Sequence, residues 1–249
     1  MDMLLEDGSV RINDLLDTFS VSIETVRRDL SELEKAGILT KTYGGAVLAS
    51  NPRGMTEVAD WRERQSIAPK EKDLIGQHAA GFIPDGCVVA LEVGTTMFAL
   101  ARHLEGHKNL TILTNDLLVA QTLWPQHGNR AFLVGGYMGA GYYTCGDLSR
   151  DFIEKFAVID LFVFSTEGLT LAEGLTTPNG EVNALKKIYI QKASKLIALC
   201  DHTKFGRKGI FHTCALERLD LLITDSKAPP HMLDKIREKG VKVEVVPVD

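Results

Sequence analysis

Residues 21–30 read Val-Ser-Ile-Glu-Thr-Val-Arg-Arg-Asp-Leu, and this stretch has the features of a helix with a defined start. Ser22 can cap the helix, because its hydroxyl can accept a hydrogen bond from a free amide of the first turn. Glu24 falls in that turn, where the positive end of the helix dipole favours an anion. The stretch therefore predicts a helix that begins just after Ser22.

The predicted helix carries its apolar residues on one side. They recur at helical spacing and predict a buried stripe of Val26, Leu30 and Leu33. The remaining sides are polar and carry Thr25, Arg27, Arg28 and Lys35. This pattern suits a helix that lies in the major groove of DNA, although a surface helix with solvated arginines would show it too.

The segments on either side predict a winged helix-turn-helix. Upstream, residues 13–19 predict a short helix capped by Asn13, with an apolar face of Leu15, Leu16 and Phe19. Ser20 and Val21 make the turn between the two helices. Downstream, Gly37 can end the second helix, as a glycine past a helix C-terminus commonly does. Residues 39–48 then alternate around Gly44-Gly45, which predicts a two-residue hairpin.

The hairpin forms the wing, and its Lys41, Thr42 and Tyr43 suit contacts to phosphate and sugar. Phosphate contacts position a protein on the duplex, whereas contacts to base edges give specificity. The predicted DNA-binding residues are Ser22, Glu24, Thr25, Arg27, Arg28, Lys41 and Tyr43.

These motifs together resemble one known family. Residues 21–30, then Leu33-Glu34, Gly37 and Tyr43-Gly44-Gly45-Ala46, resemble the DeoR family of bacterial transcriptional regulators. The resemblance extends over nearly the whole chain. Family members usually have a longer segment before the position of Gly8, which forms most of a first helix. The short segment here is expected to leave Leu15, Phe19 and Leu30 partly uncovered. Either the true translation start lies upstream, or the head folds poorly and binds DNA weakly.

Composition excludes several classes of protein. The chain has 249 residues, 45% of them hydrophobic, so it can bury a sizeable core. No apolar run approaches the roughly 20 residues that cross a membrane, and the N-terminus lacks the pattern of a signal peptide. The four cysteines are widely spaced and form neither a metal pattern nor a disulfide framework. We therefore expect a reduced cytoplasmic protein without metal or cofactor.

Charge bears on the strength of DNA binding. Residues 1–50 contain five Lys or Arg and nine Asp or Glu, which argues against strong non-specific affinity for DNA. The basic residues nevertheless cluster on the predicted recognition helix and wing. We expect modest affinity that falls quickly with salt and needs a homo-oligomer that reads two half-sites.

The chain divides into two predicted domains. Residues 1–50 form the DNA-binding head, and residues 51–66 are predicted to be a linker, because 50–54 are turn-rich and 55–65 are charged without a strong period. Residues 67–249 form the second domain, which opens with a helix at 69–82. His78 is expected at the edge of the core.

From residue 85 onward, apolar strands alternate with helices. Strands are predicted at 87–91, 111–114, 130–134, 161–165, 196–200, 221–224 and 242–246. Helices are predicted at 97–104, 117–123, 148–156, 182–193 and 230–239. This alternation predicts an α/β domain with a parallel sheet covered on both faces. In such sheets ligands bind outside the carboxyl ends of the strands, at a switch point in strand order.

Polar and glycine motifs follow the predicted strands. The first is Glu92-Val93-Gly94-Thr95-Thr96, in which a tight turn leads to free helix amides that suit a phosphate; alone, it equally fits an ordinary helix cap. Later motifs are Thr114-Asn115-Asp116, Gly135-Gly136, Thr166-Glu167-Gly168, Gly174-Leu175-Thr176-Thr177, Lys186-Lys187 and residues 201–206. Lys186 and Lys204 are the predicted cationic partners of a phosphate, whereas Lys187 is expected to be solvated and His202 to cap a turn.

The order and spacing of these motifs are similar to those of the DeoR effector domain. That domain resembles ribose-5-phosphate isomerase and glucosamine-6-phosphate deaminase in fold, and the resemblance implies a sugar-phosphate effector. The implied effector-binding residues are Glu92, Gly94, Thr95, Thr96, Asn115, Gly135, Gly136, Glu167, Gly168, Lys186, Asp201 and Lys204.

The chain departs from the family pattern at three places. Glu92-Val93 stands where the family often has Asp-Ser, and Thr166-Glu167-Gly168-Leu169 stands where it often has Ala-Asp-Gly before an isoleucine. The glutamate that usually lies four residues before the matched lysine is replaced by Val182, with Glu181 one residue earlier. These changes are expected to alter the shape of the pocket and the sugar it accepts.

Two functions remain open. The first is a regulator that binds operator DNA, represses a sugar-catabolism operon and is released by a phosphorylated sugar through a shift between conformations. The second is a sugar-phosphate isomerase or deaminase with an accessory head, in which Glu167 or Glu92 would act as the base. We expect the regulator rather than an enzyme, because no second acid or base has a comparable position.

Overall fold

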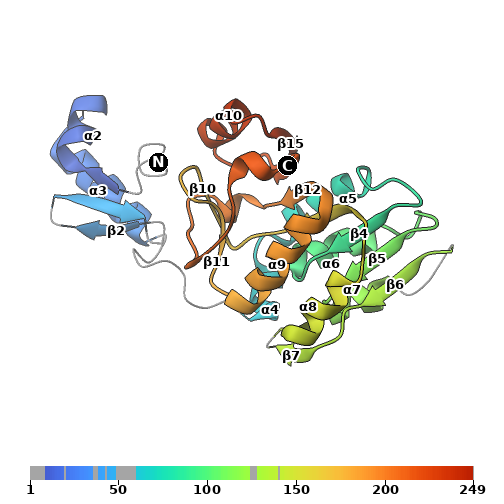
Figure 1. The fold of residues 1–249 in the computed structure, drawn as a ribbon. Helices are drawn as coiled ribbons and strands as arrows, with labels where there is room; N and C mark the ends of the chain where they lie inside the picture. Colours follow the sequence, from blue (N-terminus) through green and yellow to red (C-terminus); the bar gives the residue numbers. More distant parts are fainter. Residues whose placement is uncertain are drawn as a thin grey trace.

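The computed structural model describes residues 9–19, 21–35, 39–42, 44–48, 60–123, 128–139 and 141–248. A small N-terminal head of helices and strands precedes a larger α/β domain (Figure 1). None of the described helices has the length and apolarity needed to cross a membrane.

The head is a winged helix-turn-helix, as predicted. Its elements are β1 (Ser9–Arg11), α2 (Ile12–Phe19), α3 (Ile23–Lys35), β2 (Leu39–Thr42) and β3 (Gly45–Leu48). The strands form an antiparallel sheet in the order β1-β3-β2, and β1 is an element that the sequence did not predict.

Val26 and Leu30 of the predicted α3 stripe lie in the core of the head, whereas Leu33, also predicted to be buried, is half-buried against it. Val26 and Leu30 are each 5% exposed and pack with Val10, Leu39 and Ala46. Leu30 was expected to be partly uncovered, and this was wrong, because β1 and the wing supply apolar cover. Phe19, in contrast, is 57% exposed and lies outside this core. The segment before Ser9 lies outside the described residues.

The start of α3 is confirmed, whereas two local predictions in the head were wrong. The Ser22 hydroxyl accepts a hydrogen bond from the Thr25 amide at 3.3 Å. Asn13 does not cap α2, because the helix already begins at Ile12. The hairpin turns one residue earlier than predicted, since Thr42 pairs with Gly45. Gly45 belongs to β3, where a Cβ would lie 2.0 Å from the Val10 carbonyl oxygen.

A seven-stranded parallel sheet forms the centre of the larger domain. Its strands are β4 (Val88–Leu91), β5 (Thr111–Thr114), β6 (Arg130–Leu133), β9 (Ile159–Phe164), β12 (Ala193–Leu199), β14 (Leu221–Asp225) and β15 (Lys242–Val246). Their order is β15-β14-β12-β9-β4-β5-β6. The chain thus builds outward from β4 to β6 and returns to the other side of β4 as β9. The switch point lies between β4 and β9.

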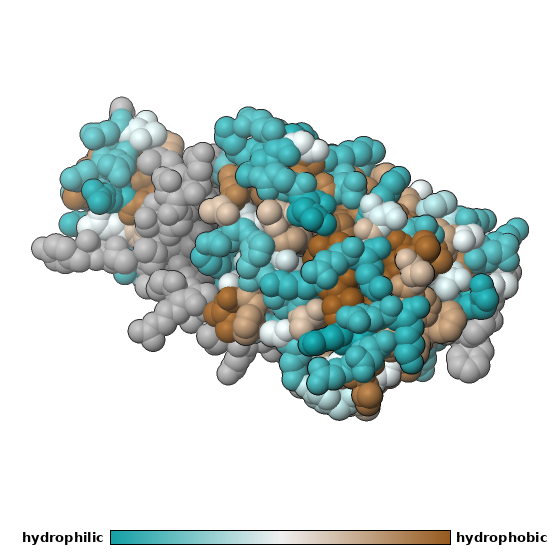
Figure 2. Space-filling view, in the orientation of Figure 1, coloured by the Kyte–Doolittle hydropathy of each residue, from teal (hydrophilic) through white to brown (hydrophobic). Residues whose placement is uncertain are grey.

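Helices cover both faces of the sheet. One face packs against α5 (Pro69–Ala80), α6 (Thr95–Arg102) and α7 (Leu117–Thr122). The other packs against α8 (Asp147–Glu154), α9 (Gly180–Lys192) and α10 (Pro230–Glu238). Burial from both sides explains why the strands are near-continuous apolar runs. The outer side of α10 is hydrophilic (Figure 2).

Several short elements outside the seven-stranded sheet were not predicted. They are the hairpin β7 (Tyr137–Gly139) and β8 (Tyr143–Cys145), the antiparallel strands β10 (Gly168–Thr170), β11 (Gly174–Thr177) and β13 (Phe211–Cys214), and the 3₁₀ turns η1 (His202–Lys204) and η2 (Leu216–Arg218). A further helix, α4 (Trp61–Ser66), lies in the expected linker and is capped by the Asp60 side chain. Its six residues are too few to show a period.

Candidate functional site

The outer side of α3 presents two arginines to solvent. Arg27 and Arg28 are exposed, and the Nε of Arg28 lies 3.9 Å from the neighbouring Asp29 carboxylate, with both side chains more than half exposed. A solvent-exposed contact at that distance leaves the guanidinium available. Glu24 is exposed and Thr25 half-buried on the same helix.

The predicted wing residue Lys41 has partners inside the head. Its ammonium lies 3.1 Å from a Glu34 carboxylate oxygen and donates to the Ser31 hydroxyl at 3.0 Å. Its amide donates to the same carboxylate at 2.9 Å, and these bonds hold the pKa of Glu34 below its usual value. Lys41 thus ties the wing to α3. Tyr43 lies outside the described residues.

The first strand-end motif places Glu92 at the switch point, directly after β4. One oxygen of its carboxylate accepts a hydrogen bond from the Ser165 amide, which follows β9, at 2.8 Å. The other lies 2.8 Å from the ammonium of Lys186 on α9. Lys186 also donates to the Ser165 carbonyl oxygen at 2.9 Å and lies 3.9 Å from Glu167. Side chains from three separate segments therefore meet where the strand order reverses.

The charges of this cluster are strongly coupled. Burial, together with the nearby Glu167 charge, raises the pKa of Glu92 to about 7 against the opposing effect of Lys186. Burial works to raise the pKa of Glu167 as well, but Lys186, Thr177 and Arg64 hold it below its usual value. Burial disfavours the charged form of Lys186, yet Glu92 and Glu167 keep its pKa above the usual value. Lys186, the predicted cationic partner of a phosphate, is thus buried and lies beside two carboxylates of the protein itself.

The loop after Glu92 leaves the start of α6 open. Gly94 has φ +132°, and its amide donates to the Asp116 carboxylate at 2.9 Å. The other oxygen of Asp116 caps α7 by accepting from the Leu118 and Val119 amides. Within the described chain, no side chain caps α6. The amides of its first turn therefore have no side-chain partner, which is the arrangement that favours an anion.

Arg64, on α4, faces this loop, and the sequence analysis missed it. A Cβ added to Gly94 would lie 3.6 Å from its Nη1, and one added to Gly141 would lie 3.8 Å from its Nη2. Its Nε is buried and has no hydrogen-bond partner in the described part of the chain. A single arginine in a charged segment without a period gave no signal that could have identified it.

Carboxylates at the end of β12 and after β9 have unused oxygens. Asp201 is fully buried and caps η1 by accepting from the Thr203 amide, while its Oδ2 accepts no hydrogen bond among the described residues and lies 3.6 Å from the Lys204 ammonium. The Oε2 of Glu167 is likewise buried without a hydrogen bond. Such oxygens could accept hydrogen bonds from hydroxyl groups.

Several other residues that were predicted to bind the effector contact neighbouring parts of the protein instead. The Asn115 side chain donates to the Thr144 carbonyl oxygen at 2.8 Å. A Cβ at Gly136 would lie 2.2 Å from the Ser149 hydroxyl, and one at Gly168 would lie 2.4 Å from the Arg207 carbonyl oxygen. Gly135, in contrast, has open space at that position. His202 bonds to Asp225 through its Nδ1 at 3.0 Å instead of only capping a turn.

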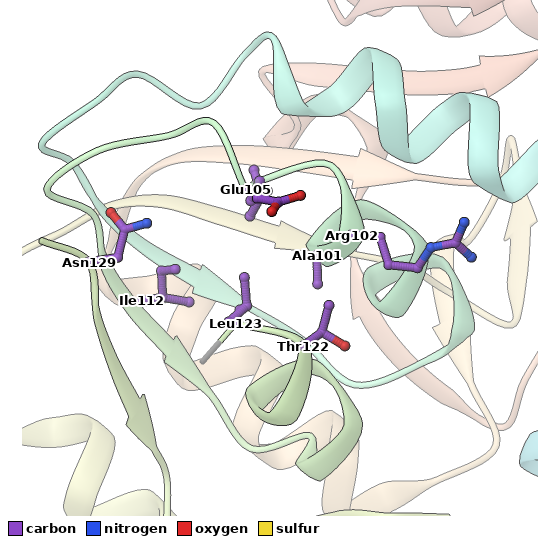
Figure 3. A pocket seen from close by; sticks show the side chains of 8 residues that line it. Ala101, Arg102, Glu105, Ile112, Thr122, Leu123 and Asn129 are labelled. Atoms are coloured by element: carbon purple, nitrogen blue, oxygen red, sulfur yellow. The ribbon is translucent and has the colours of Figure 1, made fainter. Parts of the chain in front are cut away.

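A separate cavity of about 400 Å³ lies where α6 and α7 end (Figure 3). Its lining includes Arg102 at the end of α6, Thr122 at the end of α7, and Glu105. The carboxyl ends of helices carry partial negative charge, which disfavours a phosphate. These helix ends make the cavity a weaker candidate for an anion than the Gly94 loop. No cluster of three or more His, Cys, Asp or Glu in the described residues could hold a metal ion.

Comparison with known proteins agrees with this layout. Residues 1–51 match the DeoR-like helix-turn-helix domain, and residues 67–226 match the DeoR C terminal sensor domain. The chain is 33% identical over 244 residues to the HTH-type transcriptional regulator GolR of Listeria innocua, covering 98% of this chain and 94% of that protein. It is 28% identical to the Glycerol-3-phosphate regulon repressor of Escherichia coli, covering 98% and 96%. A solved ribose-5-phosphate isomerase in complex with phospho-erythronic acid is similar at a TM-score of 0.40 and 17% identity, over 55% of this chain and 53% of that one.

Proposed function

The chain belongs to the DeoR family of transcriptional regulators, and from this premise we propose that it represses a sugar-use operon until a phosphorylated sugar binds its α/β domain. The names of its relatives support the proposal, since one of them is a repressor of a glycerol-3-phosphate regulon. The choice of a phosphorylated ligand is supported by the site itself.

The uncapped first turn of α6, facing Arg64, is the observation that carries the proposal. Backbone amides at a helix N-terminus and a guanidinium both favour a phosphate. The site lies beside the switch point, where open α/β sheets bind ligands. The unused oxygens of Asp201 and Glu167 would accept hydrogen bonds from sugar hydroxyls, and Lys204 would add positive charge.

The head would read operator DNA through α3. Arg27 and Arg28 would reach base edges, while the Thr25 hydroxyl would add a polar contact. Two copies of the head are needed to read two half-sites, so we propose a homo-oligomer. We also propose that the effector domain begins at Asp60 instead of 67, because Trp61 of α4 packs edge-on against Phe98 of α6, at 5.7 Å between ring centres.

We propose that the domain binds its ligand without chemical turnover. Both oxygens of Glu92 are engaged by Lys186 and the Ser165 amide, and Lys186 helps to hold the pKa of Glu167, the other candidate base, below its usual value. Neither carboxylate is therefore well suited to take a proton from a substrate. Incubation with sugar phosphates in heavy water, followed by NMR, would test this. Deuterium incorporation next to a carbonyl would identify an enzyme instead.

A gel-shift titration tests the proposal as a whole. The full chain is bound to DNA from upstream of its own gene, and glycerol 3-phosphate, hexose phosphates and ketose phosphates are added one at a time. At least one phosphorylated compound should release the DNA while its unphosphorylated counterpart does not. Unchanged operator binding with every compound would argue against a sugar-phosphate effector.

A further inference from the structure

We propose that Arg64 binds the effector's phosphate and that α4, the helix carrying it, transmits occupancy of the site to the DNA-binding head. This rests on the proposed function, since it assigns a regulatory connection to the same site. It adds a residue outside every strand-end motif and gives α4 a role beyond that of a linker.

The position of Arg64 is that of a ligand-binding group. Its guanidinium nitrogens come within van der Waals reach of the Cβ positions of Gly94 and Gly141, so it lies between the α6 loop and the start of the loop before β8. The absence of side chains at these two glycines leaves room beside the guanidinium. Its buried Nε has no acceptor among the described residues, so a bound anion would satisfy a donor that the protein leaves open.

The same helix is docked on the two segments that frame the site. Trp61 packs edge-on against Phe98 of α6 at 5.7 Å and against Tyr142 at 5.9 Å between ring centres. Trp61 is 8% exposed, so this contact is buried. A movement of the Gly94 loop or of the Gly141–Tyr142 turn would therefore displace α4 as well as the Arg64 side chain.

A buried lysine holds the far end of α4. The ammonium of Lys72, on α5, donates to the carbonyl oxygens of Arg64 and Ile67, the latter at 2.7 Å. Between the two helices Ala68 has φ +48°, a left-handed conformation that is strained for any residue with a Cβ. A helix that rests on the site at its start through Trp61, is held at its end by Lys72 and joins α5 through a strained residue is suited to adopt two positions.

In the sequence, α4 is the element of the larger domain that directly follows the head. Only residues 49–59 separate the end of the wing strand β3 at Leu48 from the cap of α4 at Asp60. A shift of α4 on ligand binding therefore moves the point at which the chain leaves for the head. In an oligomer this would change the relative placement of two heads, and with it their match to two half-sites.

The test uses the full chain with Trp124→Phe, so that Trp61 is the one tryptophan left. Ligand affinity, Trp61 fluorescence and operator release are measured with the sugar phosphate that releases the wild-type protein, and with inorganic phosphate. Arg64→Gln is compared with Arg64→Lys and with Arg62→Gln, an exposed arginine on the same helix. Thermal melting checks that each variant is folded.

Arg64→Gln should weaken ligand affinity about 10- to 100-fold, as expected for the loss of a charged hydrogen bond. At saturating ligand it should lack the Trp61 fluorescence change and keep its operator DNA, while Arg62→Gln behaves as wild type and Arg64→Lys is intermediate. Unchanged affinity in Arg64→Gln would overturn the binding role. Weakened affinity with full DNA release at saturation would overturn the transmission role. If no sugar phosphate affects the wild-type protein, the proposed function itself fails, and this inference with it.

Discussion

Lys186 and Glu92 form a buried ion pair at the switch point of the sheet, with 2.8 Å between ammonium and carboxylate and neither side chain more than 4% exposed. Glu167 lies 3.9 Å from the same ammonium, so one buried cation serves two carboxylates. The pair joins the end of β4 to α9, and the Ser165 backbone, which bonds to both side chains, adds the end of β9. The ion pair thus fixes the strand ends beside the candidate phosphate loop.

Lys186→Met should strongly destabilise the protein. Removing the ammonium leaves two buried carboxylates without their cation, and breaking one side of a buried pair typically costs about 3–5 kcal/mol. Urea denaturation followed by circular dichroism measures the loss. Lys187→Met, one residue away and exposed, is the matched control and should change stability by less than about 0.5 kcal/mol. Equal stability of the two variants would show that the pair contributes little.

The pH dependence of the free energy of unfolding should reflect the titration of Glu92. Burial raises its pKa from 4.5 to about 7, so the folded protein holds this proton more tightly than the unfolded chain does. The stabilisation that comes from this tightly held proton is fully present below pH 4.5 and is lost as the pH rises through about 7. The stability of the wild type relative to Glu92→Gln should therefore fall across this window, by at most about 1.4 kcal/mol per pH unit. A flat or rising difference would mean that the carboxylate stays charged throughout.

Long apolar runs made the sheet predictable. The strands at 111–114 and 242–246 have the predicted bounds, and the others agree to within a few residues, because burial on both faces requires continuous apolar sequence. The position of Glu92 at the carboxyl end of a strand followed from the alternation of strands and helices, whereas the switch point beside it is visible only in the strand order of the folded sheet. The marginal strands β10 and β13 were missed, since three or four residues cannot show a period.

The contacts within the site could not be predicted from spacing. Sequence spacing marked Lys186 as a cation near the strand ends, but it could not show that Glu92 and Glu167 lie against it. Arg64 comes from a six-residue helix far from the strand-end motifs in sequence. Gly136 was read as a point of ligand approach, whereas the close neighbour at that position is the Ser149 hydroxyl.

Gly94→Ala should abolish the effector response and leave DNA binding intact. At φ +132° and ψ 171° the backbone lies in a region that is essentially restricted to glycine, and forcing another residue there costs about 1–3 kcal/mol. Relaxing that strain would move the amide that Asp116 holds and disorganise the first turn of α6. Calorimetric titration with a sugar phosphate measures the loss. Gly106→Ala, where an added Cβ meets nothing within 4 Å, is the control and should bind normally.

Arg27→Ala and Arg28→Ala should each weaken operator binding by about 1–3 kcal/mol if the guanidinium contacts a base edge. Both side chains are exposed on α3, and neither contributes to the core formed by Val26 and Leu30, so the head should remain folded. Fluorescence anisotropy with operator and with scrambled DNA, at several salt concentrations, distinguishes a contact to a base edge from a contact to a phosphate. A base contact relaxes sequence preference, whereas a phosphate contact weakens both DNAs equally and lowers the salt slope by about one. Arg150→Ala, an exposed arginine on α8, is the control. Wild-type affinity in both arginine variants would exclude α3 as the helix that reads DNA.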